Sequence, residues 1–261
     1  MGYYRLTGYM YPFQFREGNH LFKENVTFQI IENHYRFDKR FRLLLIEVIE
    51  QIEIAIRAKI CNTMCLKYGA HWYLMKDLFI NNDFHDNFIT EIKKHCNESS
   101  EVFIKKYLNT YSDPALPPAW MMMETITFRK MAVLYKNLKD TEEKKLIANS
   151  YALAVNIFES WLQSLNFVRN CCAHHLRLWN RRLPIKPVIP RRKNNRFLKE
   201  VTEATDQQMY GILSCILFLL KTINPNSDFK LRLKKLFEDH PSVNIAYMGF
   251  VGEWKSEDIW L

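Results

Sequence analysis

The chain has 261 residues, 48% of them hydrophobic and 25% charged, and its formal net charge at pH 7 is +9. An apolar fraction of this size can build a buried core and excludes an intrinsically disordered chain. The longest apolar run, 211–220, is about half of the roughly 20 residues that a membrane-spanning helix needs, so we expect a buried helix there and no membrane partner.

The amino-terminal residues and the cysteines indicate the cellular compartment. The first residues, MGYYRLTGYMYPF, lack the basic segment and following apolar run of a secretory signal. The six cysteines lie inside hydrophobic segments and form no C-x-x-C pair. This usage is typical of reduced thiols, so we expect a cytoplasmic protein.

Apolar residues in 37–60 recur every three or four positions, which predicts a long amphipathic helix that ends near Gly69. A weaker helical pattern covers 82–108. Three prolines and an aspartate interrupt the chain at 112–120. Helical periodicity resumes at 120–138 and again from about Thr141, but the pattern does not decide whether 141–180 is one helix or two.

The remaining chain continues the helical pattern after a break. Prolines at 184, 187 and 190 predict a loop over 184–196, and two further helices are expected at 204–223 and 227–238. Hardly any segment alternates with a period of two. We therefore predict one all-α domain over 1–261, a helical bundle with long amphipathic helices.

The positive charge is concentrated in one segment. Residues 169–199 hold ten lysines or arginines and no acidic residue, which leaves 27 basic against 28 acidic residues elsewhere. Such a segment favours a polyanionic partner, and Trp179 and Phe197 within it could stack on bases. The alternative is a solvated basic face beside a loop.

The stretch FVRNCCAHHLRLWNRR at 167–182 combines an amide, two imidazoles and several guanidiniums. On a continuous helix, Asn170, His174, Arg177 and Arg181 share a sector of about 60°, with Arg169 at its margin, whereas His175 points away. Imidazole exchanges protons near neutral pH and guanidinium binds phosphate, so this strip suits a phosphate-ester site. The alternative is that Asn170 and His174 cap or bridge neighbouring helices.

With RNA as substrate, this chemistry needs no metal ion, because the 2'-hydroxyl of the substrate can attack the adjacent phosphorus. The products would be a 2',3'-cyclic phosphate and a 5'-hydroxyl. One histidine serves poorly as base and acid on opposite sides of phosphorus, which favours two copies meeting across a two-fold axis.

The spacing R-N-x-x-x-H resembles the R-x-x-x-x-H signature of HEPN ribonucleases. Five stretches resemble bacterial abortive-infection proteins of the AbiD/AbiF type: GYYRLTGYMYPF at 2–13, RFDKRFRLLLIEVIEQIEIAIRAKI at 36–60, PPAWMMMETITF at 117–128, VRNCCAHHLRLWNRRL at 168–183 and MGFVGEWKSEDIW at 248–260. The resemblance implies an all-α HEPN fold, phage defence by a growth-arresting or toxic ribonuclease, and pairing of two HEPN units. It also implies that Arg169 and His174 are the catalytic pair and Asn170 the polar residue of the motif.

The chain departs from that family in two places. Related sequences carry a further helical segment ahead of GYYRL, so we expect an amino-terminal portion to be missing. They also show Phe-Gly where this chain has Phe128 and Arg129.

Other candidate sites are weaker. Cys171, Cys172, His174 and His175 point in different directions on a helix, and a set of Cys61, Cys65 and His71 lacks a fourth ligand, so we expect no metal ion and no cofactor. Either of two acids, Glu124 or Glu159, could orient His174 or simply form a surface ion pair. Four tyrosines could stack on bases or pack in the core: Tyr3, Tyr4, Tyr9 and Tyr11.

The sequence thus predicts a metal-independent, dimeric endoribonuclease. Its partners would be RNA, a second copy, and an antitoxin or small regulatory RNA. The catalytic residues would be Arg169, Asn170 and His174. The predicted RNA-binding residues are Arg177, Arg181, Arg182, Arg191, Arg192, Lys193 and Arg196. The alternatives are a non-catalytic module that holds a regulatory RNA through 169–199, and a protein that docks an acidic partner.

Overall fold

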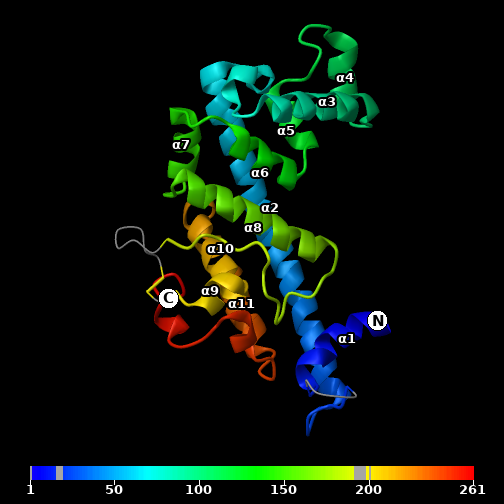
Figure 1. Cartoon of the computed structure of the whole chain (residues 1–261), viewed down its shortest axis with the longest axis vertical. Helices are drawn as coiled ribbons and strands as arrows, with labels where there is room; N and C mark the ends of the chain where they lie inside the picture. The colour runs from blue at the N-terminus through cyan, green and yellow to red at the C-terminus, as the bar shows by residue number, and fades with distance from the viewer. Residues whose placement is uncertain (1, 16–19, 191–197, 200) are drawn as a thin grey trace. The chain divides into compact units, whose positions relative to one another are not determined.

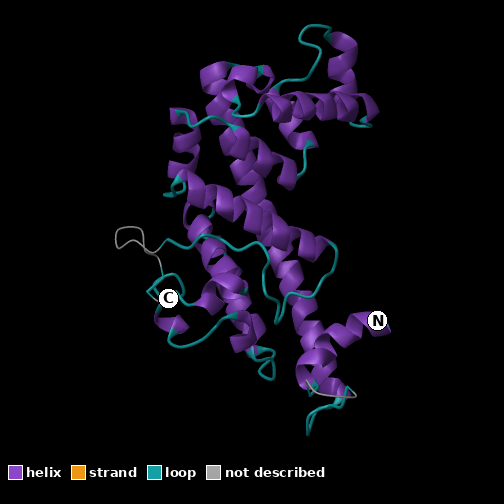
Figure 2. Cartoon of the chain, in the orientation of Figure 1, coloured by secondary structure: helices purple, strands orange, loops and turns teal. Residues whose placement is uncertain are grey.

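The structure is a computed structural model that describes residues 2–15, 20–190, 198–199 and 201–261. Within these ranges the chain consists of helices and loops and has no β-strand (Figure 2). The described backbone pairs in β fashion at two isolated bridges, Gln14 with Phe22 and Phe79 with Leu138. The predicted all-α bundle is therefore confirmed.

The α-helices follow one another along the chain as labelled in Figure 1. Their bounds are α1 Tyr3–Met10, α2 Phe28–Tyr68, α3 Asn82–Glu98, α4 Val102–Thr110, α5 Ala119–Thr125, α6 Phe128–Asn137, α7 Glu142–Asn149, α8 Val155–Ala173, α9 Glu203–Gln207, α10 Met209–Ile223 and α11 Phe229–Glu238. Short 3₁₀ turns cover Tyr11–Phe13, Trp72–Leu74, Lys76–Leu78, Ile245–Met248 and Trp254–Ser256.

The chain divides into two compact units. Unit one consists of Met1–Gln51 and Ser164–Leu261, and unit two consists of Ile52–Gln163. The long helices α2 and α8 each contribute residues to both units. The R-N-x-x-x-H motif and the described part of the basic segment belong to unit one.

Helix α2 is longer than its apolar pattern predicts. It begins at Phe28 and ends at Tyr68, where Gly69 takes a left-handed φ of 87° that suits glycine. The predicted end near Gly69 is confirmed. In unit one, Phe37 of α2 lies 6.2 Å from the ring of Phe237 on α11, and this contact joins the two helices in the core.

The predicted buried helix at 211–220 is confirmed within α10. Its Ser214 accepts a hydrogen bond from the indole of Trp260 at 3.1 Å, which ties the C-terminal segment to the core. The single helix predicted over 204–223 is wrong, because the chain breaks between α9 and α10. At that break a Cβ on Gly211 would lie 2.3 Å from the carbonyl oxygen of Thr205, so only glycine permits the close approach.

Local capping explains two other breaks, both in unit two. The pattern at 82–108 holds α3 and α4, with a turn in which Ser99 Oγ accepts from the backbone of Glu101 at 3.2 Å. The pattern at 120–138 holds α5 and α6, since Thr127 Oγ1 accepts from the backbone of Lys130 at 3.3 Å and starts a new helix. The break predicted at 112–120 is confirmed up to Pro118, after which α5 begins.

The stretch 141–180 contains two helices and a loop. Thr141 caps α7 and is followed by Glu142 and Glu143 in the first turn. A left-handed residue, Ala152 with φ 54°, separates α7 from α8. The loop predicted at 184–196 is confirmed for 184–190, and 191–196 lies outside the described residues.

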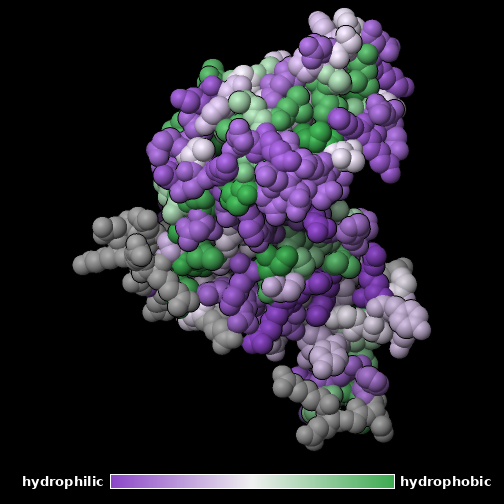
Figure 3. All heavy atoms as spheres, turned by 45° about the horizontal axis from the view of Figure 1, so that its top comes forward, coloured by the Kyte–Doolittle hydropathy of each residue, from purple (hydrophilic) through white to green (hydrophobic). Residues whose placement is uncertain are grey.

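No helix in the described ranges has both the length and the apolar character that crossing a membrane requires. The molecular face drawn in Figure 3 is mostly hydrophilic, with hydrophobic residues interspersed. This distribution is ordinary for the surface of a globular chain.

Candidate functional site

The motif lies on the solvent side of the last turns of α8. On the opposite face Leu165, Val168 and Cys171 are buried, because apolar residues three and four apart turn toward the core of unit one. Arg169 and Asn170 are half-buried, and His174 is exposed. The side chains expected to do chemistry are therefore reachable from solvent.

The turn that follows α8 gives the two histidines different backbone conformations. The backbone N–H of His174 still donates to the carbonyl of Asn170 at 2.9 Å, so His174 keeps the helical register with the asparagine one turn earlier. His175 then takes a left-handed φ of 56°. Its N–H donates to Cys172, and the N–H of Leu176 donates to Cys171 at 2.8 Å. This Schellman arrangement ends the helix.

The prediction that the helix continues to about residue 180 is wrong. Because α8 ends at Ala173, the residues Arg177, Arg181 and Arg182 lie on the following loop, and the helical angles predicted for them do not apply. The physical reason is the left-handed turn at His175, which directs the chain back toward the core.

A buried carboxylate holds that loop. Asp38 of α2 is fully buried and accepts hydrogen bonds from the backbone N–H of Trp179 at 2.8 Å and of Leu178 at 3.2 Å. It also accepts from the Tyr9 hydroxyl at 2.5 Å and from the guanidinium of Arg42. The segment after the motif is thereby fixed to both α1 and α2.

The charges of this network balance. Burial raises the pKa of Asp38, while Arg42, Tyr9 and the two backbone N–H groups act in the opposite direction. Burial opposes the charge on Arg42, but Asp38, Tyr9 and Cys172 together outweigh it and raise the pKa of Arg42. Arg42 donates further to the carbonyl of Leu176 at 3.3 Å. The pair thus fixes the backbone two residues after His174.

The side chain of Trp179 also holds the loop after α8 in place. Its ring lies 4.4 Å from His34 and 6.1 Å from Phe13, and its indole N–H donates to the carbonyl of Asn244 at 3.2 Å. The side chain is fully buried. The expectation that Trp179 offers a base-stacking surface is therefore wrong, and Phe197 lies outside the described residues.

The arginines after the motif differ in environment. Arg177 is half-buried, and its Nη1 is shielded from solvent with no hydrogen-bond partner among the described residues. Burial lowers the pKa of Arg177, an effect that Asp38 partly offsets. Arg181 donates to the Arg177 carbonyl at 3.3 Å, and its guanidinium lies 5.6 Å from the ring centre of Phe167.

The other predicted RNA-binding residues are only partly described. Arg182 is exposed. Four lie outside the described residues: Arg191, Arg192, Lys193 and Arg196. Arg177 and Arg181 therefore lie half-buried on the loop after the motif, whereas Arg182 is exposed to solvent.

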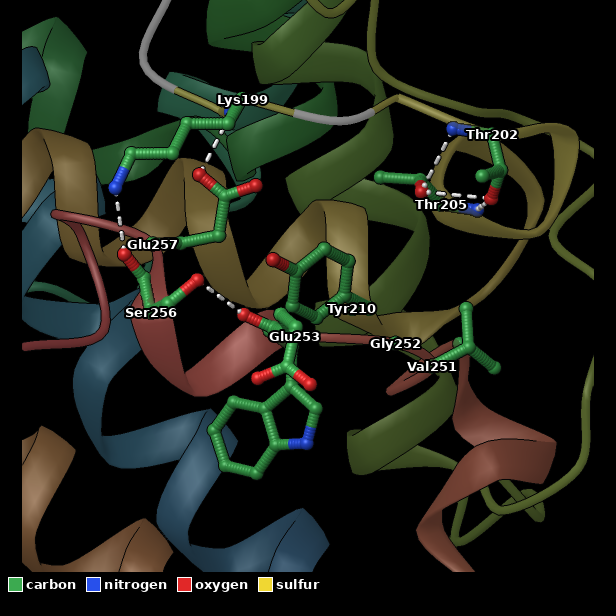
Figure 4. Close-up of a pocket in the computed structure, with 11 residues that line it drawn as sticks. Lys199, Thr202, Thr205, Tyr210, Val251, Gly252, Glu253, Ser256 and Glu257 are labelled. Atoms are coloured by element: carbon green, nitrogen blue, oxygen red, sulfur yellow. Dashed lines mark hydrogen bonds between the residues drawn. The ribbon is translucent and has the colours of Figure 1, made fainter.

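A separate hollow of about 140 Å³ lies where the basic segment meets the C-terminal segment (Figure 4). There the carboxylate of Glu257 accepts from the backbone N–H of Lys199 at 2.6 Å. The Lys199 ammonium donates to the carbonyl of Ser256 and pairs with Asp258 at 2.9 Å. Lys199 is thus engaged within the chain and adds little free charge to the basic segment.

The weaker candidates find other roles. Glu159 pairs with buried Lys144 at 2.8 Å inside unit two. All six cysteines are free thiols, and burial raises the pKa of Cys172 to about 12. No three His, Cys, Asp or Glu side chains of the described chain gather as a metal site would require.

The Asp38 network was not predicted from the sequence. A signal was present, because Asp38 occupies an apolar position of α2 between Phe37 and Phe41 and has an arginine, Arg42, four residues later. A charged pair in an apolar register indicates a buried ion pair. Its partner in the loop after α8 is about 140 residues away, which no local pattern reveals.

The chain was compared with known protein families, curated proteins and solved structures. A family model described as Abi-like protein matches residues 1–180. The match spans α1 to α8, and so it includes the motif, the Asp38 network and Trp179. Searches of curated proteins and of solved structures gave no match.

Proposed function

We propose that this chain, which belongs to the Abi-like protein family and has a role in abortive infection, acts there as an endoribonuclease. The observation that carries the proposal is the exposure of His174 in helical register with Asn170, five residues after Arg169, on the solvent side of α8. The spacing of these residues resembles that of HEPN ribonucleases.

Each residue of the motif has a role in this chemistry. His174 takes a proton from the attacking 2'-hydroxyl or gives one to the leaving 5'-oxygen. Arg169 binds the scissile phosphate and stabilises the negative charge of the transition state. Asn170 orients either group through its amide. The substrate supplies the nucleophile, so the reaction requires no metal ion.

A second copy of the chain would complete the site. In-line displacement places the attacking and leaving oxygens on opposite sides of phosphorus, and each copy exposes a single His174 on this face of α8. Two copies related by a two-fold axis provide one imidazole for each side. We therefore propose a homodimer as the active species.

The surrounding loop supports the proposal. Asp38 and Arg42 fix the backbone at residues 176–179, and Arg177 and Arg181 follow His174 by three and seven residues. Both guanidiniums are suited to phosphates beside the scissile one. An antitoxin or small regulatory RNA could occupy the same basic segment and restrain cleavage.

The test uses purified full-length protein and total RNA in the presence of EDTA. We expect cleavage products with 5'-hydroxyl and 2',3'-cyclic phosphate ends. A DNA oligonucleotide with the sequence of a mapped cleavage site should not be cut. A substrate with a single 2'-deoxy nucleotide at the mapped site should resist cleavage there. Salt-sensitive binding of RNA without cleavage under any condition would refute the enzyme and favour a module that holds a regulatory RNA.

The dimer is tested by dilution. The rate per chain should fall once the concentration drops below the dimer dissociation constant, and sedimentation should show dissociation over the same range. A rate per chain that stays constant when sedimentation shows monomers would contradict the shared site.

A further inference from the structure

The four tyrosines near the amino terminus separate into two groups. Tyr9 is buried and hydrogen-bonded to Asp38, whereas Tyr3 is 69%, Tyr4 90% and Tyr11 67% exposed, and the rings of Tyr3 and Tyr4 meet edge-on at 5.7 Å. Large exposed aromatic rings need an explanation when they gather on one face, because isolated ones are ordinary.

Tyr4 and Tyr11 share one face of α1. The N–H of Tyr11 donates to the carbonyl of Thr7, so the helical register continues through Tyr11. Residues seven apart on a helix lie on the same side, separated by a rise of about 10 Å. Gly8 falls between them on that side, and without a side chain it leaves the backbone bare between the two rings.

Arg177 occupies the space at this gap. Its Nε lies 4.0 Å from the point where a Cβ of Gly8 would stand. Arg177 is half-buried, and its Nη1 has no hydrogen-bond partner in the described chain. Asp38 accepts hydrogen bonds from Tyr9, Arg42 and the backbone, so Arg177 lies against Gly8, on the helix face that carries Tyr4 and Tyr11, without a hydrogen-bonded counter-ion.

These features match the chemistry of one nucleotide. A guanidinium binds a phosphate through two N–H groups. A tyrosine ring stacks on any base, because every base has a π-face. Single-stranded RNA offers both groups at once, since its bases are free to leave the stack. An acidic peptide would pair with the guanidinium but would leave the two aromatic rings without a partner.

We infer that Tyr4, Tyr11 and Arg177 form a binding site for a nucleotide of single-stranded RNA that flanks the scissile one, with the phosphate on Arg177 and bases on the tyrosines. The inference rests on RNA as the substrate of the proposed function, but it concerns binding and not cleavage. Arg177 follows His174 by three residues, so their Cα atoms are at most about 10 Å apart. A nucleotide held there is a close neighbour of the cleaved bond.

Burial supports the assignment of a phosphate to Arg177. Burial lowers the pKa of this guanidinium and Arg181 adds to that effect, whereas Asp38 and Tyr9 raise the pKa. Because Nη1 is shielded from solvent, a phosphate that supplies this counter-charge would bind through the other N–H groups of the guanidinium. The same anion would meet Arg181, whose Nη1 donates to the Arg177 carbonyl.

The experiment measures binding in the full chain carrying His174→Ala, so that cleavage does not interfere. The probes are a short fluorescein-labelled single-stranded RNA and a strand of equal length whose nucleotides are abasic. Tyr4→Ala with Tyr11→Ala should weaken binding of the first probe by about 5- to 100-fold and leave the abasic probe unaffected. Phenylalanine at both positions should restore most of the affinity.

Arg177→Gln should weaken binding of both probes and lower the salt dependence by about one phosphate contact. Arg177→Lys keeps the charge and should retain part of the affinity for the abasic probe. Tyr111→Ala removes a tyrosine that is 56% exposed in unit two and should change nothing.

The outcomes separate this inference from the proposed function. Failure of the wild-type chain to cut RNA refutes the enzyme but leaves these binding measurements intact. The inference is overturned if the two tyrosine variants bind RNA like their parent, or if they lose the abasic probe equally. It is also overturned if they leave RNA binding intact but convert a dimer into monomers, since the face would then join two copies.

Discussion

Replacing Asp38 by asparagine tests whether a buried carboxylate fixes the loop after α8. Asp38 is fully buried and accepts from Tyr9, Arg42 and the backbone of Leu178 and Trp179. Asparagine keeps the shape but removes the charge, which leaves the buried guanidinium of Arg42 without its counter-ion. Breaking a buried ion pair in this way costs about 3–5 kcal/mol. This is a large share of the roughly 5–15 kcal/mol by which a folded domain is stable.

The assay is urea unfolding followed by tryptophan fluorescence and circular dichroism. The matched control is Glu32→Gln, which breaks another i,i+4 pair on α2, the one between Arg36 and Glu32 at 2.7 Å. That pair is exposed, so its loss should cost about 0.5 kcal/mol or less. Replacing both Asp38 and Arg42, as Asp38→Asn with Arg42→Met, should recover part of the loss. An Asp38→Asn variant within about 0.5 kcal/mol of the control would refute the reasoning.

Three further predictions concern packing and protonation. Gly211→Ala places a Cβ 2.3 Å from the carbonyl oxygen of Thr205, so α9 and α10 must separate, and we expect a loss of about 1–3 kcal/mol by urea unfolding. Lys144→Met leaves two backbone carbonyls and a carboxylate without their buried donor, and we expect a loss of about 3 kcal/mol by the same measurement. Burial lowers the pKa of His34, so the unfolded chain binds a proton that the folded chain does not as the pH falls below about 6.5. The free energy of unfolding should therefore decrease toward pH 5, and His34→Gln should flatten that slope by up to about 1.4 kcal/mol per pH unit.

Each of these predictions has a control. Gly8→Ala meets its nearest contact at 4.0 Å and should be neutral or slightly stabilising, and a loss equal to that of Gly211→Ala would contradict the close approach. Lys145 neighbours Lys144 but is exposed, so Lys145→Met should cost less than about 1 kcal/mol. For the pH dependence the wild-type chain is the reference, and an unchanged slope in His34→Gln would contradict the role of its burial.

The helices that could be predicted are those whose apolar residues recur with helical spacing. The register of α2 and the buried run in α10 follow from residues that recur every three or four positions. The breaks at Ser99 and Thr127 were missed because single hydroxyls cap the backbone there without disturbing that periodicity. Local hydrogen bonds thus decide the helix ends that patterning leaves undecided.

Helical periodicity also predicted part of the candidate site. The spacing of Asn170 and His174 holds because both lie within the hydrogen-bonded register of α8. The end of that helix was missed, since His175 adopts a left-handed conformation that glycine or asparagine would have signalled. The loop beyond α8 is held in place by Asp38. This contact joins residues about 140 positions apart, so no short stretch of sequence reveals it.

The rate of RNA cleavage by neighbouring histidine variants tests the central claim most directly. His174→Ala removes the exposed imidazole of the motif, and we expect a single-turnover rate lower by about 10²- to 10⁴-fold with unchanged RNA binding. His175→Gly removes the adjacent imidazole while favouring the left-handed backbone that caps α8, and it should cleave like the wild type. A folded His174→Ala variant that cleaves as fast as His175→Gly would contradict the account.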